Sequence, residues 1–213
     1  MSHNRPREIL LVFIKYPQSG HVKTRLIPSV GARAAATIYR RLAETLVTRV
    51  RGLQRPGLVG LFFVDPPERL SECARWLDAP ECTFLPQCDG DLGARMRDAF
   101  SQAFDRGADR VIIIGTDCPE LDGSRIDAAF EALRNHDAVL GPALDGGYYL
   151  LGLNYALPQV FEGVPWSSSR TARETRRRLE EARCWVAELP ILRDLDTPED
   201  LELLRQSWPT LFA

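Results

Sequence analysis

The feature that most constrains the fold is an alternation of short apolar runs and amphipathic segments along nearly the whole chain. The apolar runs at residues 9–14, 58–64 and 111–114 have the length and the strand-forming residues of buried parallel strands. Between the first two runs, apolar residues recur at every fourth position over residues 32–50, which predicts a helix with one buried face. Alternating strands and helices of this kind predict a doubly wound, mostly parallel α/β sheet with helices on both faces.

The remaining segments continue the same pattern. Further strands are expected at residues 83–85, 138–140 and 185–189, and further helices at 68–77, 92–104, 124–133 and 171–182, with a last helix opened by the segment DTPE at 196–199. The segment YYLLGL at 148–153 predicts an irregular or antiparallel strand. Because the 213 residues contain no internal repeat and no linker, we expect a single domain that spans residues 1–213.

Composition limits which classes of partner the protein is expected to bind and which cellular compartment it suits. The formal net charge is −2, whereas nucleic-acid binders concentrate Lys and Arg, so we expect no nucleic-acid partner. Five cysteines without a CxxC pair fit reduced thiols better than zinc ligands. The polar start MSHNRPRE leads into only six consecutive apolar residues, too few for a signal peptide or a membrane span. We therefore expect a cytoplasmic protein without membrane insertion, and the sequence is silent on its oligomeric state.

The loop KYPQSGHVKTRL at residues 15–26 follows the first predicted strand directly. Gly20 lets backbone amides approach an anion, and Lys23 with Arg25 can neutralise a di- or triphosphate. The GxxxxGK[ST] spacing of a Walker A loop is absent. Two basic residues after a strand also occur simply as solvated side chains, so the spacing alone leaves both interpretations open.

Three aspartates are candidate metal ligands. Asp117 stands in the segment GTDCP at the end of the predicted central strand, where a carboxylate can hold Mg²⁺ or Mn²⁺ against phosphate oxygens. The alternative is that Asp117 accepts hydrogen bonds from its own turn. Asp194 and Asp196 alternate on an extended segment and so point the same way, and a cation between them would relieve their repulsion. Asp196 could instead cap the last helix, as could Thr197.

A glycine-rich segment after residue 144 is a candidate for contact with substrate. Asp145, Gly146, Gly147 and Tyr148 suit a surface on which backbone approaches a sugar or base and an aromatic ring, Tyr148 or Tyr149, stacks on it. The sequence DGG is equally an ordinary tight turn. Without further context the turn is the slightly favoured interpretation.

A second glycine-containing segment precedes the helix at residues 92–104. Gln87, Gly90 and Gly93 lie in it, and the glycines make the entry to that helix flexible. The segment could read the edge of a base, or it could be a plain loop. The pattern alone does not distinguish these interpretations.

The motifs together resemble a known family. KYPxxGxVKTRL, GDLGxRM, GTDCPxL, GPAxDGGYYLLGL, PWS and DLDTPEDL occur in the order found in the bacterial DUF2064 glycosyltransferase-like family, which is related to arsenosugar-biosynthesis glycosyltransferases. The match covers nearly the entire chain. That family is assigned to the GT-A fold of the nucleotide-diphospho-sugar transferase superfamily, which also includes molybdenum-cofactor and phospholactate guanylyltransferases. The resemblance implies a nucleotide bound over the first half of the sheet.

The resemblance also implies roles for individual residues. The first loop would hold phosphates, the second glycine-containing segment would lie near the base, and the acidic positions would bind the metal. The residues concerned are Gly20, Lys23 and Arg25 for the phosphates, Gln87, Gly90 and Gly93 for the base, and Asp117, Asp194 and Asp196 for the metal.

The expected activity is a metal-dependent glycosyl transfer from a nucleotide sugar to a small acceptor that the sequence does not identify. Asp117, Lys23 and Arg25 are the expected catalytic residues. Two departures keep other activities open: the first loop lacks the LxGGxSxRMG form of the molybdenum-cofactor enzymes, and GTDCP offers one acid where many glycosyltransferases have DxD. The alternatives are nucleotidyl transfer from a nucleoside triphosphate, of the guanylyltransferase kind that releases pyrophosphate, and a non-catalytic nucleotide sensor.

Overall fold

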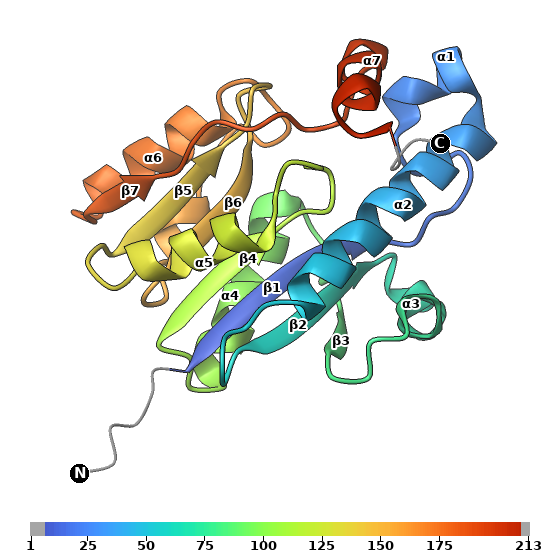
Figure 1. Ribbon diagram of the computed structural model, residues 1–213. Helices are drawn as coiled ribbons and strands as arrows, with labels where there is room; N and C mark the ends of the chain where they lie inside the picture. Colours follow the sequence, from blue (N-terminus) through green and yellow to red (C-terminus); the bar gives the residue numbers. More distant parts are fainter. Residues whose placement is uncertain (1–6, 210–213) are drawn as a thin grey trace.

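The computed structural model describes residues 7–209, so most of the polar start lies outside it. Its strands form a seven-stranded sheet in the order β3-β2-β1-β4-β6-β5-β7 (Figure 1). They are β1 (Glu8–Lys15), β2 (Val59–Asp65), β3 (Thr83–Pro86), β4 (Arg110–Ile114), β5 (Ala138–Pro142), β6 (Tyr148–Leu153) and β7 (Val186–Glu188). Only β6 runs antiparallel to its neighbours, β4 and β5, among the strands of this sheet. The predicted doubly wound, mostly parallel sheet and its antiparallel segment are confirmed.

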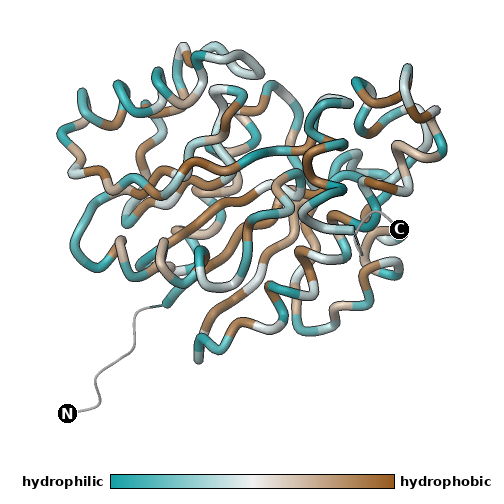
Figure 2. The backbone as a smooth tube through the Cα atoms, turned by 45° about the horizontal axis from the view of Figure 1, so that its top comes forward, coloured by the Kyte–Doolittle hydropathy of each residue, from teal (hydrophilic) through white to brown (hydrophobic). Residues whose placement is uncertain are grey.

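Helices cover both faces of the sheet. On one face lie α2 (Ala32–Arg51), α3 (Leu70–Leu77) and α5 (Gly123–Ala132), and on the other lie α4 (Leu92–Asp105) and α6 (Thr171–Glu181). β1 supplies both cores because successive side chains of a strand point to opposite faces: Leu10 and Val12 pack on the first face, Ile9 and Leu11 on the second. In Figure 2 the hydrophobic colour is concentrated along the central strands.

The chain also forms four short helices: η1 (Thr24–Leu26), α1 (Ile27–Val30), η2 (Pro67–Arg69) and η3 (Pro158–Phe161). Of these, only η2 overlaps a predicted helix, the one at 68–77. The other three were not predicted, because three or four residues are too few for a helical period to be visible in the sequence. No helix within residues 7–209 is both long and apolar enough to cross a membrane.

The last helix, α7 (Pro198–Ser207), packs on α2 through a third buried cluster (Figure 1). Thr197 is its N-cap: the Thr197 side chain accepts from the backbone N–H of Asp200, and the Asp200 carboxylate accepts from the backbone N–H of Thr197. Asp196 is therefore not the cap. Its carboxylate remains available for contacts with the first loop, which α7 holds close by.

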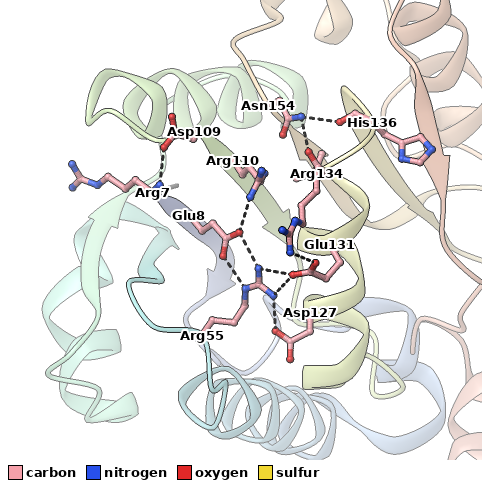
Figure 3. A network of polar contacts seen from close by, with 11 residues as sticks. Arg7, Glu8, Arg55, Asp109, Arg110, Asp127, Glu131, Arg134, His136 and Asn154 are labelled. Carbon is pink, nitrogen blue, oxygen red and sulfur yellow. Dashed lines mark hydrogen bonds and ion pairs between the residues drawn. The ribbon is translucent and has the colours of Figure 1, made fainter. Parts of the chain in front are cut away.

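A polar network closes the amino ends of β1 and β4 (Figure 3). The Glu8 carboxylate, in a residue only 8% exposed, accepts from Arg55 at 2.8 and 2.9 Å, and Arg110 approaches it at 3.4 Å. Asp127 and Glu131 of α5 contact the same Arg55 at 3.2 and 3.4 Å. The bidentate pair satisfies both groups in a nearly dry position. This end of the sheet is thereby sealed, and the open end is the opposite one.

Candidate active site

A cavity of about 730 Å³ opens at the carboxyl ends of β1 and β4. Ten of the predicted site residues line it: Lys23, Arg25, Gln87, Gly90, Asp117, Asp145, Gly147, Tyr148, Asp194 and Asp196. The carboxyl ends of parallel strands meet at one edge, which is where open α/β sheets bind ligands. The cavity accordingly joins segments as distant in sequence as Lys23 and Asp196, which are 173 positions apart.

Lys23 lies at the centre of the charged side of this cavity. Its Nζ donates to the backbone oxygen of Leu195 at 2.5 Å and lies 2.9 Å from Asp117 Oδ1 and 3.1 Å from Asp196 Oδ1. Burial alone would lower the pKa of the Lys23 ammonium, but the two carboxylates outweigh burial and the pKa is raised. Arg25 also contacts Asp196, at 3.3 Å, with a side chain that is 65% exposed.

Asp194 is the most perturbed acid of the site. Burial, first, and the neighbouring carboxylates of Asp117, Asp145 and Asp196 together raise the pKa of its carboxyl to about 7, against the opposing influence of Lys23. Like charges in a poorly solvated position favour the neutral form of a carboxyl group. A cation brought to this side of the cavity would therefore stabilise the ionised form of Asp194.

The carboxylate oxygens in the cavity suit a divalent metal that enters together with a substrate. In residues 7–209 no three Asp, Glu, His or Cys side chains converge as a metal-binding group. Between two of the three predicted carboxylates, Asp117 and Asp196, lies the Lys23 ammonium, which contacts both. The buried Oδ1 atoms of Asp117 and Asp194 nevertheless have no hydrogen-bond partner, although Asp117 Oδ1 is ion-paired with Lys23. Mg²⁺ is commonly held by one or two carboxylates together with substrate phosphates, and these oxygens suit that arrangement.

The opposite side of the cavity is organised by Gln87 and Arg95. Gln87, only 6% exposed, donates from Nε2 to the backbone oxygen of Phe63 at 3.0 Å and accepts at Oε1 from Arg95 at 3.2 Å. Arg95 also bonds the backbone oxygen of Gly90 at 3.1 Å and pairs with Asp65 at 3.0 Å. Both ends of the Gln87 amide are thus fixed in orientation. Arg95 was not among the predicted site residues, although its place in the motif GDLGxRM was an available signal.

Three predicted glycines do not line the cavity. A Cβ at Gly93 would lie 2.4 Å from the indole nitrogen of Trp166, so the residue is small because the indole packs on it. A Cβ at Gly146 would lie 2.2 Å from the backbone oxygen of Ser169, and the residue has a positive φ of 86°. Gly20 lies in the turn before Lys23. Packing and backbone shape therefore account for Gly93 and Gly146 without a ligand.

Asp145 and Tyr148 border the cavity on the side of β6. The Asp145 carboxylate accepts from the backbone N–H of Gly147 at 2.7 Å, so the tight turn favoured from the sequence is formed, and Asp145 and Gly147 still line the cavity. The hydroxyl of Tyr148 contacts the Met96 sulfur at 3.5 Å, and burial raises the pKa of Tyr148. The residues 167–169 and Thr171, at the start of α6, also line the cavity and were not predicted.

Comparison with known proteins shows the family of the chain. Residues 51–168 match the model of a family described as uncharacterized proteins conserved in bacteria, DUF2064. The match covers more than half of the 213 residues. The chain belongs to the DUF2064 family. The resemblance to this family that the motifs indicated is confirmed.

Relatives of this DUF2064 protein include enzymes with named activities. The 3-phospho-D-glycerate guanylyltransferase of Phenylobacterium zucineum (strain HLK1) is 30% identical over 182 residues, which are 84% of this chain and 81% of the relative. A crystal structure from Desulfovibrio desulfuricans G20, provisionally named a nucleotide-diphospho-sugar transferase, has a TM-score of 0.84 and 36% identity over 95% of this chain and 87% of that one.

A third protein shares the fold at greater distance. The structure of a Mycobacterium tuberculosis H37Rv protein in complex with manganese has a TM-score of 0.57 and 15% identity, over 94% of this chain and 99% of that one. Together these comparisons confirm the nucleotide-diphospho-sugar transferase fold and the predicted enzyme class. The DUF2064 protein is a transferase of the superfamily that contains nucleotidyltransferases and nucleotide-sugar transferases.

Proposed function

We propose that this DUF2064 protein is a metal-dependent nucleotidyltransferase that joins a nucleoside monophosphate from a nucleoside triphosphate to a small phosphorylated acceptor. The observation that carries the proposal is the buried Lys23 ammonium held between Asp117 and Asp196 at the carboxyl end of the central strand. This arrangement provides a cation and hard oxygen donors side by side, which is what the transfer of a charged phosphoryl group requires.

In the proposed reaction an oxygen of the acceptor phosphate attacks the α-phosphorus of the nucleotide. The bond from the α-phosphorus to the oxygen that bridges it to the β-phosphorus breaks, and pyrophosphate leaves with that electron pair. Arg25, exposed and close to the acidic side of the cavity, is placed to neutralise the leaving phosphates. The carboxylates of Asp117, Asp194 and Asp196 line this side of the cavity and would hold the divalent metal. When bound, the metal offsets the charge of the triphosphate.

Two considerations support nucleotidyl over glycosyl transfer. The relative from Phenylobacterium zucineum is named a guanylyltransferase. The segment GTDCP also offers a single acid in place of DxD. Glycosyl transfer, the expectation favoured by the motifs, is therefore the second candidate. The name of the Desulfovibrio structure supports it. Manganese in the Mycobacterium tuberculosis structure supports a divalent metal for either reaction.

The products distinguish these activities. The protein is incubated with each of the four nucleoside triphosphates, Mg²⁺ or Mn²⁺, and a panel of small phosphorylated acids that includes 3-phospho-D-glycerate. We expect acceptor-dependent release of pyrophosphate, absent in Asp117→Asn. Release of nucleoside diphosphate from nucleotide sugars, without pyrophosphate from triphosphates, would establish glycosyl transfer instead. Tight nucleotide binding without either product would indicate a sensor.

A further inference from the structure

The Lys23 ammonium is held by three oxygens of the protein itself. Its Nζ donates hydrogen bonds to the backbone oxygen of Leu195 at 2.5 Å and to Asp196 Oδ1 at 3.1 Å, and it is ion-paired with Asp117 Oδ1 at 2.9 Å. The side chain is only 3% exposed. In this position Lys23 cannot contact a phosphate in the cavity without giving up one of these partners.

Lysine is rare in this chain, where nearly all basic residues are arginine. Among the 27 Lys and Arg residues of the chain only Lys15 and Lys23 are lysine, and both line the cavity. Arginine forms every other ion pair found in residues 7–209. An ammonium is a compact point charge on a flexible stem, whereas a guanidinium is a planar fork that suits fixed bidentate pairs. The cavity therefore carries the kind of cation that can fill a small oxygen-lined position and also leave it.

We infer that Lys23 and the divalent cation alternate on the same carboxylates, so that cation binding releases the Lys23 ammonium into the cavity. The inference rests on the metal dependence of the proposed function. The oxygens of Asp117 and Asp196 that Lys23 contacts are the hard donors that Mg²⁺ and Mn²⁺ use. An ammonium and a dication on the same oxygens would repel each other at short range.

The exchange gives the lysine two successive partners. Before a metal–nucleotide complex enters, Lys23 pairs with Asp117 and Asp196 and ties the first loop to the segment that precedes α7. Afterwards its positive charge is free to pair with the phosphates that arrive with the metal. Lys23 is then available to the triphosphate only when the metal is present, which couples nucleotide contact to metal binding.

The first test measures access to the Lys23 amine. The parent protein is acetylated with an amine-reactive ester with and without Mn²⁺ alone, and the modification of its two lysines is quantified by peptide mass spectrometry. Lys15 is exposed and lines the same cavity, so it serves as the internal reference. We expect Mn²⁺ to accelerate acetylation of Lys23 several-fold relative to Lys15. An unchanged Lys23 rate at saturating Mn²⁺ would overturn the exchange.

The second test measures affinity for Mn²⁺ by calorimetry in the parent, Lys23→Met and Lys15→Met. If Lys23 competes with the cation, Lys23→Met should bind Mn²⁺ about tenfold more tightly or better, because a charge-assisted contact no longer has to be broken. Lys15→Met removes one positive charge from the same cavity without freeing these carboxylates, so we expect a much smaller gain. Equal gains in the two variants, weaker binding in Lys23→Met, or no Mn²⁺ binding in any of the three proteins would contradict the inference.

Neither test uses a nucleotide or an acceptor, so their failure leaves the nucleotidyl transfer to be judged by pyrophosphate release. If Lys23→Met does not fold, the acetylation of the parent protein still decides the question. A thermal melt supplies the remaining check: Mn²⁺ should raise the melting temperature of Lys23→Met more than that of the parent, since ligands that bind the native state stabilise it. An equal or smaller rise in Lys23→Met would count against the exchange.

Discussion

Replacement of Asp194 by asparagine should change how the stability of the protein depends on pH. The pKa of the Asp194 carboxyl is raised from 3.8 to about 7 in the folded protein, first by burial and then by neighbouring carboxylates. Between these two pH values the folded state binds a proton that the unfolded chain has lost, so the free energy of unfolding falls as the pH rises. The full effect corresponds to about 4 kcal/mol, at 1.36 kcal/mol for each tenfold change in proton affinity. Asparagine removes it, because the amide does not ionise.

The assay is urea unfolding of the parent and Asp194→Asn at pH 5 and pH 8. At pH 5 the carboxyl in the folded parent is protonated, so asparagine is a close match for it. From pH 5 to pH 8 the parent should lose up to about 3 kcal/mol more than the variant, which is the part of the effect that lies above pH 5. The exposed Glu162→Gln serves as the control and should follow the parent. Parallel pH profiles for the parent and Asp194→Asn would refute the argument that Asp194 is held neutral by burial and like charge.

Three further predictions concern the site and the scaffold. Asp117→Asn should keep the melting temperature of the parent but lose the Mn²⁺-dependent part of GTP binding in calorimetry, and unchanged metal-dependent affinity would remove Asp117 from the metal site. Gly93→Ala should lower the free energy of unfolding in urea by about 1–3 kcal/mol, because the new methyl meets the Trp166 indole at 2.4 Å; a neutral result would mean that the indole moves away easily. Arg55→Leu should cost about 3 kcal/mol in the same assay because Glu8 is left buried without its partner, and a much smaller loss would show that Glu8 reaches water or another cation.

The strands were predicted closely from local patterns. The run at 9–14 became Glu8–Lys15, and the run at 111–114 became Arg110–Ile114 at the centre of the sheet. Such runs are readable because strands covered on both faces need apolar side chains on both, which leaves a continuous signal in the sequence. The short helices η1, α1 and η3 leave no comparable signal, since their formation depends on the packing of the loops around them.

The residues that line the site were predicted better than the contacts that they make. Lys23, Asp117 and Asp196 were expected to share a crevice because each follows or precedes an element of the same sheet edge, and all three line one cavity. Lys23 was predicted to contact a phosphate, whereas in the structure it contacts two carboxylates. The motif GDLGxRM contains Arg95 but does not show which groups Arg95 contacts. Those are the backbone oxygen of Gly90, Gln87 and Asp65, which only the fold brings to it.

The sequence by itself determined which polar residues stand at the ends of buried strands. An apolar run and the spacing of its apolar side chains can be read from residues that are adjacent in the chain. Only the tertiary structure decided which of the polar residues face each other. β1, β4 and the segment before α7 become neighbours through the strand order and the packing of α7 on α2, and these depend on connections across more than a hundred residues. The same assembly buries Asp194 among like charges and places Lys23 between Asp117 and Asp196. Charge interactions act through space and change with solvation, so their partners and their strength are set by the fold as a whole.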